Sequence, residues 1–185
     1  MYPVFLKLEG RRVLLVGAGR VAVGKLQGLL AAGARVTVVA PDVLPEIERP
    51  GVEIRRRPFA PTDVDGVWLV VAAAPPAVNR AVSAAAEARQ LFVNAVDDPV
   101  NASVYLGGVV RRSGVTIAIS TDGRAPALSG LLREALEAWL PADISRWLDA
   151  SDSARREWRE NAVPMEHRRP QLLKTLNALY ELKSQ

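Results

Sequence analysis

Residues 12–22 read RVLLVGAGRVA, and this stretch decides the fold. It begins with a short apolar run that stops at Gly17, a pattern typical of a buried strand. The residues that follow place Val21, Leu26 and Leu29 at helical spacing. A strand, a tight turn and a helix in this order predict the first unit of an α/β fold.

The alternation of short β-branched runs and helical stretches continues to about Asp97. Gly33 stands where a left-handed residue would end the first helix. The alternation predicts a Rossmann-like, doubly wound parallel sheet. The expected strands are 12–16, 35–39, 52–56, 67–72 and 91–95, with helices at 21–30 and 76–89.

After Asp97 the pattern changes, because two β-rich runs follow each other with no room for a crossover helix. We expect these two strands to pair antiparallel, and Pro164 and Pro170 to separate the last two helices. The sheet is thus followed by a small mixed region and C-terminal helices. The expected elements are strands at 103–110 and 114–120, then helices from Pro126 to Pro141, over 143–160 and over 171–183.

The composition excludes several kinds of site. The chain has 185 residues and no cysteine, which excludes disulfides, thiolate metal sites and cysteine nucleophiles. His167 is the single histidine, so we expect no metal site. The formal charge of +4 comes from basic residues interleaved with acidic ones, so no nucleic-acid partner is expected.

The sequence shows no segment that would insert into a membrane. The longest apolar run, 66–78, is interrupted by Pro75 and Pro76 and is shorter than the roughly 20 residues that span a bilayer. The first residues show no basic segment followed by a long apolar stretch. We therefore expect a cytoplasmic location and no membrane partner.

The segment GAGRVA at 17–22 has the G-x-G-x-x-A form of a dinucleotide-binding motif. Gly17 permits the tight turn, Gly19 allows the backbone to approach a pyrophosphate, and Ala22 lets helix and strand pack closely. The diphosphate would lie on the helix N-terminus at Arg20, Val21 and Ala22. The alternative is a strand-to-helix turn without a ligand.

Asp42 follows the second strand, about 20 residues after the glycines, where an acidic residue can hold the adenosine ribose hydroxyls. No arginine follows it directly, which favours NAD over NADP. The alternative for Asp42 is that it caps a short helix.

Asn94 and Asp97 lie at the carboxyl end of the last expected parallel strand, the edge at which open α/β sheets bind ligands. We expect Asn94 to lie beside the cofactor, and the Asp97 carboxylate to serve as a general base. The alternative is that residues 97–99 form a simple turn.

Ser120, Thr121 and Arg124 precede the helix that begins at Pro126. Backbone amides and a helix N-terminus at this point could receive an anionic substrate, with Arg124 adding a positive charge. The alternative is a capping loop with Gly123 in a left-handed turn.

Several spaced motifs occur together and in one order. They are PVFL at 3–6, VLLVGAGRVA at 13–22 with Lys25, VTVVAP at 36–41, VNAVDD at 93–98, IAIST at 117–121 and LLRE at 131–134. In these motifs the chain resembles precorrin-2 dehydrogenase, which is also the N-terminal region of multifunctional sirohaem synthase. The resemblance covers about Met1 to Pro141.

This resemblance implies NAD-dependent oxidation of the tetrapyrrole precorrin-2 to sirohydrochlorin in sirohaem biosynthesis, with ferrochelatase activity in some members. The aspartate of the family's Asn-x-x-Asp motif falls on Asp97. The resemblance also implies a homodimer, with a Rossmann domain at 1–100, a dimerisation and substrate-binding region at 101–141 and a helical domain at 142–185.

The sequence departs from the family pattern at four positions, which are Gly24, Gly107, Asp122 and Ala125. Asp122 adds a negative charge near an acidic substrate, and Ala125 removes a helix cap worth about 1 kcal/mol. Two other functions stay open: a non-catalytic protein that binds NAD and a tetrapyrrole, and an unrelated NAD-linked oxidoreductase.

Overall fold

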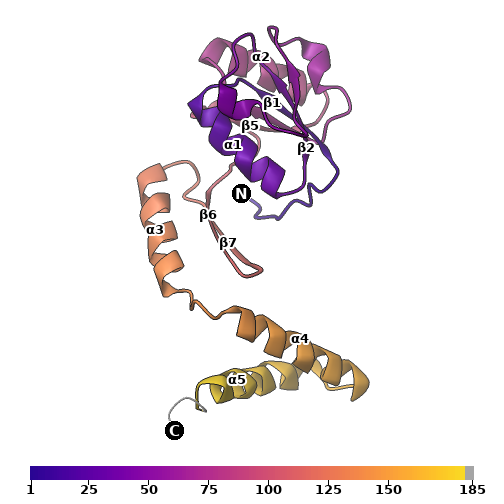
Figure 1. The fold of residues 1–185 in the computed structure, drawn as a ribbon, viewed down its shortest axis with the longest axis vertical. Helices are drawn as coiled ribbons and strands as arrows, with labels where there is room; N and C mark the ends of the chain where they lie inside the picture. Colours follow the sequence, from indigo (N-terminus) through magenta and orange to yellow (C-terminus); the bar gives the residue numbers. More distant parts are fainter. Residues whose placement is uncertain (182–185) are drawn as a thin grey trace. The chain divides into compact units, whose positions relative to one another are not determined.

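The structure is a computed structural model that describes residues 1–181 and forms two compact units. The first unit runs from Met1 to Leu106, and the second begins at Gly107. The expected boundaries after residues 100 and 141 stay predictions. Each unit is described by itself (Figure 1).

The first unit contains a five-stranded sheet with the order β3-β2-β1-β4-β5. All four strand pairings are parallel, with Leu15 of β1, for example, paired with Val38 of β2 and Val71 of β4. This topology confirms the expected Rossmann-like, doubly wound α/β fold. The strands are β1 (Arg12–Val16), β2 (Arg35–Val39), β3 (Glu53–Arg55), β4 (Leu69–Ala72) and β5 (Phe92–Ala95).

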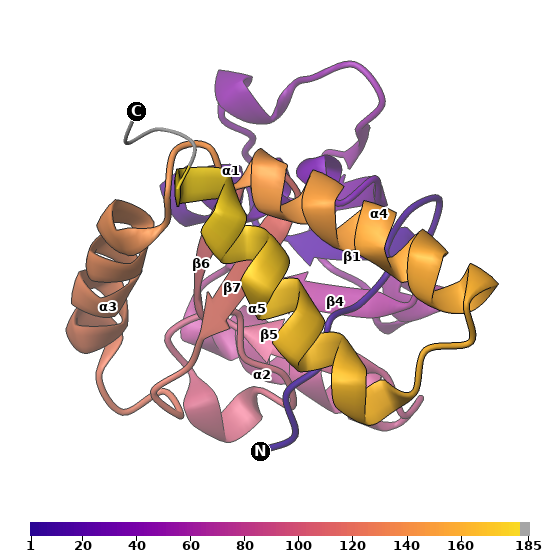
Figure 2. The same ribbon diagram turned by 90° about the horizontal axis from the view of Figure 1, so that it is seen from below.

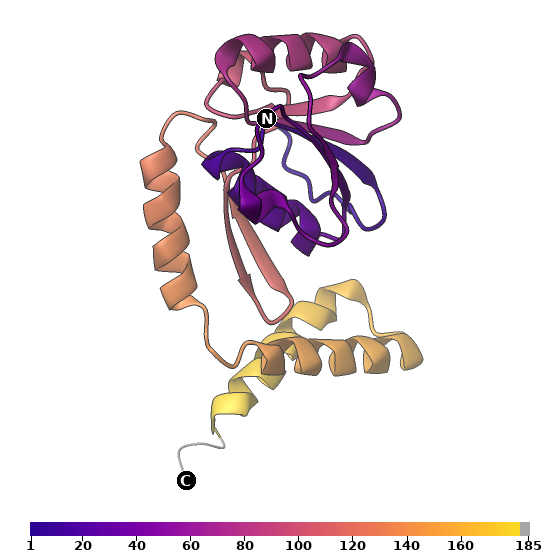
Figure 3. The same cartoon turned by 45° about the horizontal axis from the view of Figure 1, so that its top comes forward.

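Two helices, α1 (Arg20–Ala31) and α2 (Pro76–Glu87), cover opposite faces of this sheet (Figure 3). Leu15 and Leu26 belong to the core on the α1 side, whereas Leu14 belongs to the core on the α2 side. Strand β1 is buried on both faces, which is why its sequence is an unbroken apolar run. Short 3₁₀ helices occur at η1 (Pro45–Ile47), η2 (Pro61–Val64) and η3 (Pro99–Asn101).

The second unit begins with an antiparallel hairpin, as expected, and continues with three helices. Val110, Leu140 and Ile144 form its small core. Helices α4 and α5 pack against each other (Figure 2), and Trp147 donates a hydrogen bond of 2.5 Å to the Tyr180 hydroxyl between them. The elements are β6 (Gly108–Arg112), β7 (Val115–Ile119), α3 (Pro126–Trp139), α4 (Ser145–Glu160) and α5 (Met165–Glu181).

The strand expected at 103–110 was placed too early, because β6 begins only at Gly108. The N–H groups of Ser103 and Val104 both bind the Val93 carbonyl, at 2.9 and 3.0 Å. A segment with both amides on one carbonyl cannot continue as a regular ladder strand.

The expected break at Pro170 was also wrong, because α5 starts at Met165 and continues through Pro170. Proline removes the intrahelical hydrogen bond that residue 170 would donate to the Glu166 carbonyl, and the helix continues on the hydrogen bonds of the following turns. The expected end at Lys183 lies outside the described residues. No helix within residues 1–181 is both long and apolar enough to cross a membrane.

Asp63 in η2 is a buried carboxylate whose hydrogen bonds hold the loop after β3 in place. It accepts hydrogen bonds from Arg57, from Arg55 at 3.2 Å and from the Ala60 N–H at 2.9 Å. The hydrogen bonds from Arg57 are the main cause that lowers the pKa of Asp63 from 3.8 to about 2.

We expect this lowered pKa to make stability depend on pH. The stabilisation by Asp63, about 2 kcal/mol, is complete above 3.8 and is lost as the pH falls toward about 2, because the unfolded chain then binds the proton more tightly. Acid unfolding followed by circular dichroism should show this loss in the wild type. Asp63→Asn should lower stability at neutral pH and flatten the dependence in that range.

The matched control is Asp65→Asn, because Asp65 forms an exposed ion pair with Arg89. Exposed pairs contribute about 0–1 kcal/mol, so this variant should keep the stability and the acid dependence of the wild type. Equal effects of the two substitutions would contradict the role given to Asp63.

Candidate functional site

A cavity of about 990 Å³ opens at the carboxyl ends of β1, β2 and β4. The loops that follow these three strands, together with the segment after β3, form its walls. Its lining residues include Gly17, Gly19, Arg20, Asp42, Pro58, Phe59, Ala74 and Val78. The predicted glycine motif therefore lies at the ligand-binding edge of the sheet.

Gly17 joins two of these loops by close contact. Its φ is +98°, and a Cβ at this position would lie 2.2 Å from the carbonyl oxygen of Ala73. Its N–H donates to the Val39 carbonyl at 2.9 Å. Both the backbone conformation and the contact with the β4–α2 turn require a residue without a side chain.

Gly19 meets a different requirement, because a Cβ there would have no neighbour within 4 Å. It is the N-cap residue of α1 and forms no side-chain cap. The first N–H groups of a helix have no intrahelical partner and attract an anion. The open space at Gly19 therefore fits the approach of a pyrophosphate to the backbone at Arg20 and Val21.

Ala22 is fully buried in the core beneath the glycine turn, whereas Val21 is half exposed. Neither side chain lines the cavity. Ala22 thus has the packing position expected of the last small residue of the motif.

The other walls of the cavity are fixed by local hydrogen bonds. The Leu44 N–H donates to the Ala18 carbonyl at 3.2 Å, which joins the loop after β2 to the glycine turn. The buried Asn79 side chain accepts a hydrogen bond from the Ala74 N–H at 3.0 Å and holds the loop after β4. Asp63 holds the segment that carries Pro58 and Phe59.

Sequence patterns do not reveal Pro58, Phe59 or Asn79 as parts of the site. Pro58 and Phe59 lie in an irregular segment after β3, and Asn79 lies within the alanine-rich helix α2. Only in the folded chain do Pro58 and Phe59 line the cavity and does Asn79 hold one of its walls.

Asp42 is exposed at the mouth of the cavity. The capping alternative is wrong, because Leu44 is the N-cap residue of η1 and no side chain caps that helix. The Asp42 carboxylate has no hydrogen-bond or ion-pair partner within the described residues, so it is free to accept hydrogen bonds from a ligand.

Asn94 is buried but does not line the cavity. Its amide nitrogen donates to the Val104 carbonyl at 2.9 Å, and its Oδ1 is the buried side-chain atom without a partner in the described part of the chain. The structure thus gives Asn94 a contact that ties residues 103–104 to β5, and leaves one acceptor unsatisfied.

Asp97 follows β5 in a turn closed by the Asp98 N–H on the Ala95 carbonyl at 3.4 Å. Its φ is +56°, a left-handed conformation that aspartate tolerates better than most residues. The backbone at 95–98 is therefore a turn, close to the one considered as the alternative at 97–99, and Pro99 already begins η3. This turn leaves the Asp97 carboxylate at the carboxyl edge of the sheet.

Lys25 of α1 is a charged group near Asp97 whose role the sequence patterns did not reveal. The side chain is half buried and forms no ion pair within 4.0 Å in residues 1–181. Burial lowers the pKa of the Lys25 ammonium, and the Asp97 carboxylate acts in the opposite direction. The two opposite charges therefore interact, although no ion pair joins them.

Ser120, Thr121 and Arg124 lie in the second unit, before α3. The Thr121 hydroxyl donates to the Ala125 carbonyl at 3.1 Å and lies 3.1 Å from the Ser129 hydroxyl, and the Ser120 hydroxyl accepts from the Asp122 N–H at 3.1 Å. These two hydroxyls therefore hold the loop, whereas no side chain caps α3, whose N-cap residue is Ala125. Arg124 is exposed, and its side chain has no partner within the described residues.

In residues 1–181, no three or more His, Asp or Glu side chains are grouped so that they could hold a metal ion. In the first unit the candidate site consists of the backbone amides at the start of α1 and of Asp42; Asp97, which is exposed, and Lys25 do not line the cavity. The loop before α3 belongs to the second unit and is a separate candidate.

Comparisons with known proteins agree with this geometry. The family described as "Putative NAD(P)-binding" matches residues 4–108. Siroheme synthase 3 of Aeromonas hydrophila is 40% identical over 172 residues, which is 90% of this chain and 37% of that protein. Siroheme synthase of Chromobacterium violaceum is 45% identical over 151 residues, which is 78% of this chain and 32% of that protein.

A solved structure titled "SirC, precorrin-2 dehydrogenase" matches with a TM-score of 0.79 and 29% identity, covering 98% of this chain and 92% of that one. The chain spans about a third of the length of the sirohaem synthases that it matches. The chain belongs to the NAD(P)-binding family and, within it, to the family of precorrin-2 dehydrogenase and the N-terminal region of sirohaem synthase.

Proposed function

We propose that this chain catalyses the NAD-dependent oxidation of precorrin-2 to sirohydrochlorin, a step of sirohaem biosynthesis. One observation carries the proposal: the cavity formed around Gly17 and Gly19 occurs in a chain that matches a precorrin-2 dehydrogenase along nearly its whole length. A catalytic dehydrogenase accounts for both features at once, whereas an unrelated oxidoreductase accounts only for the cavity.

The cofactor would be held by the glycine turn and by Asp42. Backbone N–H groups at the start of α1 would bind the diphosphate, and the free Asp42 carboxylate would accept hydrogen bonds from the adenosine ribose. The carboxylate would repel a ribose phosphate, which favours NAD over NADP. Bound NAD would supply the hydride acceptor.

Asp97 is proposed as the general base. Oxidation of precorrin-2 removes two hydrogens from the macrocycle, one as a hydride and one as a proton, and the Asp97 carboxylate would accept the proton. Asn94 would contribute by fixing the segment beside β5 rather than by touching the cofactor.

The substrate carries many carboxylates, and the loop before α3 offers positive potential for them. Arg124 has free donors, and the first N–H groups of α3 lie next to it in the chain. Ser120 and Thr121 would act by holding this loop, since their hydroxyls are engaged in it.

We further propose a homodimer in the cytoplasm. Helix α3 carries an apolar stripe that is exposed in the single chain, and burial of such a stripe favours association. Its members are Leu128, Leu131, Leu132 and Trp139, which are 49%, 64%, 41% and 69% exposed.

The proposed activity is tested by mixing the purified chain with enzymatically prepared precorrin-2 and NAD. We expect sirohydrochlorin and NADH to form in equal amounts, which absorbance spectra measure. Tetrapyrrole binding without NADH would instead support a non-catalytic carrier, and NADH formation from other substrates alone would support an unrelated oxidoreductase.

The two glycines should respond differently to substitution. Gly19→Val should keep the melting temperature but weaken NAD binding by about 100-fold or more, because the side chain would occupy the space of the diphosphate and break its charge-assisted hydrogen bonds. Gly17→Ala should lower the free energy of unfolding by about 2 kcal/mol or more, because of the clash and the positive φ. Calorimetry and thermal unfolding measure both effects.

Gly28→Ala is the matched control, since this glycine of α1 has nothing within 4 Å of its Cβ position. It should keep NAD affinity and gain up to about 1 kcal/mol of stability. Normal NAD binding by Gly19→Val would remove the glycine turn from the proposed site.

Asp97→Asn should lower kcat by about 100-fold or more while NAD affinity stays unchanged, because the amide cannot accept the proton. Asparagine also tolerates the left-handed backbone, so the fold should persist. Steady-state kinetics and calorimetry provide the two readouts. Asp98→Asn is the neighbouring control and should retain turnover; equal losses in both variants would argue against a specific base.

A further inference from the structure

The amino ends of the parallel strands carry a row of basic and aromatic side chains. Arg12 of β1 pairs in register with Arg35 of β2, and the Trp68 N–H donates to the Arg12 carbonyl at 2.8 Å from the other side. Residues in register on neighbouring strands share one face of the sheet, about 4.8 Å apart. Arg35, Arg12 and Trp68 therefore form one row across three strands, all of them exposed.

Trp68 is covered on one face by a third arginine. The guanidinium carbon of Arg11 lies 3.7 Å from the centre of its ring, a cation–π stack that fixes the plane of Arg11. The Arg12 guanidinium passes over Gly66, where a Cβ would lie only 2.1 Å from it. Arg11, Arg12 and Trp68 are thus packed on their own unit.

None of Arg11, Arg12 and Arg35 forms a side-chain hydrogen bond or an ion pair within the described residues. The nearby acidic groups are engaged elsewhere: Glu53 accepts from Arg55 at 2.8 Å, and Asp65 pairs with Arg89 at 2.5 Å.

Glu9, two residues before Arg11, makes no ion pair with any of the three arginines. Like charges on adjacent strands repel each other and lower the stability of the fold. No acidic side chain of the described residues forms an ion pair with these arginines to compensate this repulsion.

We propose that this row and the adjacent Arg11 together form a docking surface for an acidic segment of a partner protein. The surface consists of Arg11, Arg12, Arg35 and Trp68. Carboxylates of the partner would accept hydrogen bonds from the free guanidinium groups and relieve their mutual repulsion. Arginine and tryptophan are also the residues most enriched where protein interfaces gain their affinity.

The structure favours a protein over a single-stranded nucleic acid. Binding of single strands uses aromatic faces on which bases stack, along a groove of several charges. Here Trp68 offers one face at most, because Arg11 already covers the other. Three arginines on one short row match a few carboxylates better than a continuous phosphate backbone.

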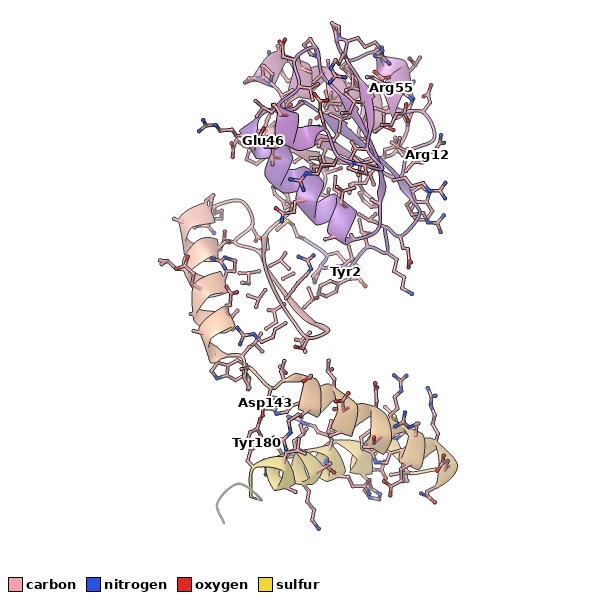
Figure 4. The ribbon with its side chains drawn as sticks, viewed as in Figure 1. Tyr2, Arg12, Glu46, Arg55, Asp143 and Tyr180 are labelled. Atoms are coloured by element: carbon pink, nitrogen blue, oxygen red, sulfur yellow. The ribbon has the colours of Figure 1, made fainter. Side chains whose placement is uncertain are left out.

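This surface is separate from the proposed cofactor site. The cavity lies at the carboxyl ends of the strands, whereas Arg12 and Arg35 begin β1 and β2. Figure 4 shows Arg12 and Glu46, the latter in η1 after β2, on opposite sides of the unit. Docking on the row would therefore leave the cavity open.

The test uses the full chain and a fluorescein-labelled peptide of alternating glutamate and tyrosine as the acidic probe. Fluorescence anisotropy should show binding that weakens about tenfold or more when Arg12→Gln and Arg35→Gln are combined, because charge-assisted hydrogen bonds are lost. A peptide with glutamine in place of glutamate should not bind. The melting temperature of Arg35→Gln should equal or exceed that of the wild type.

The matched control combines Arg155→Gln and Arg156→Gln, two exposed arginines of α4, and should bind the peptide like the wild type. The proposal is overturned if this control loses as much binding as the Arg12 and Arg35 variant, or if that variant loses none. Tighter binding of a labelled oligouridine on the same arginines would replace the protein partner by a nucleic acid. A clear drop in the melting temperature of Arg35→Gln would show that the arginines serve folding instead.

Discussion

The close approach of Gly17 to the Ala73 carbonyl is the contact on which the rest of the first unit depends. It brings the turn after β1 against the turn after β4, so that helices α1 and α2 can leave the sheet on opposite faces (Figure 3). The cavity is the space that remains where these two helices diverge. A side chain at residue 17 would separate the turns and remove both walls of the site.

In a parallel sheet all amino ends of the strands lie on one side and all carboxyl ends on the other. The two sides of this sheet attract negative charge in different ways. At the carboxyl edge the donors are backbone amides at the start of α1, which carry no net charge and suit a diphosphate held close to the chain. At the amino ends of the strands the donors are the guanidinium groups of the exposed residues Arg11, Arg12 and Arg35, of which Arg11 packs on Trp68 and Arg12 over Gly66. The first edge favours a small ligand in a cavity, and the second favours a surface contact.

The charged groups Asp63, Lys25 and Asp97 of the first unit differ in how their charges are compensated. Asp63 is fully satisfied by arginines and a backbone amide, and its role is to hold the loop that carries Pro58 and Phe59. Lys25 and Asp97 interact only through space, and Asp97 sits on a backbone with positive φ. Unsatisfied charge and strain gathered at one sheet edge are typical of a functional site, whereas a saturated cluster is typical of a structural one.

The sequence by itself determined the doubly wound sheet, the glycine turn and the antiparallel hairpin. The spacing of apolar residues and the position of turn glycines are local properties of the sequence, and in these elements the local preference agrees with the fold. It misplaced the start of β6, because the Ser103 and Val104 amides bind Val93 instead of a ladder partner. It also placed a break at Pro170, although a proline near the start of a helix need not end it. Only the tertiary structure decided that Phe59 lines the cavity, that the charges of Lys25 and Asp97 interact and that Arg12 lies beside Arg35. These are contacts between segments far apart in the chain, and strand order and register, which no local pattern contains, bring them together.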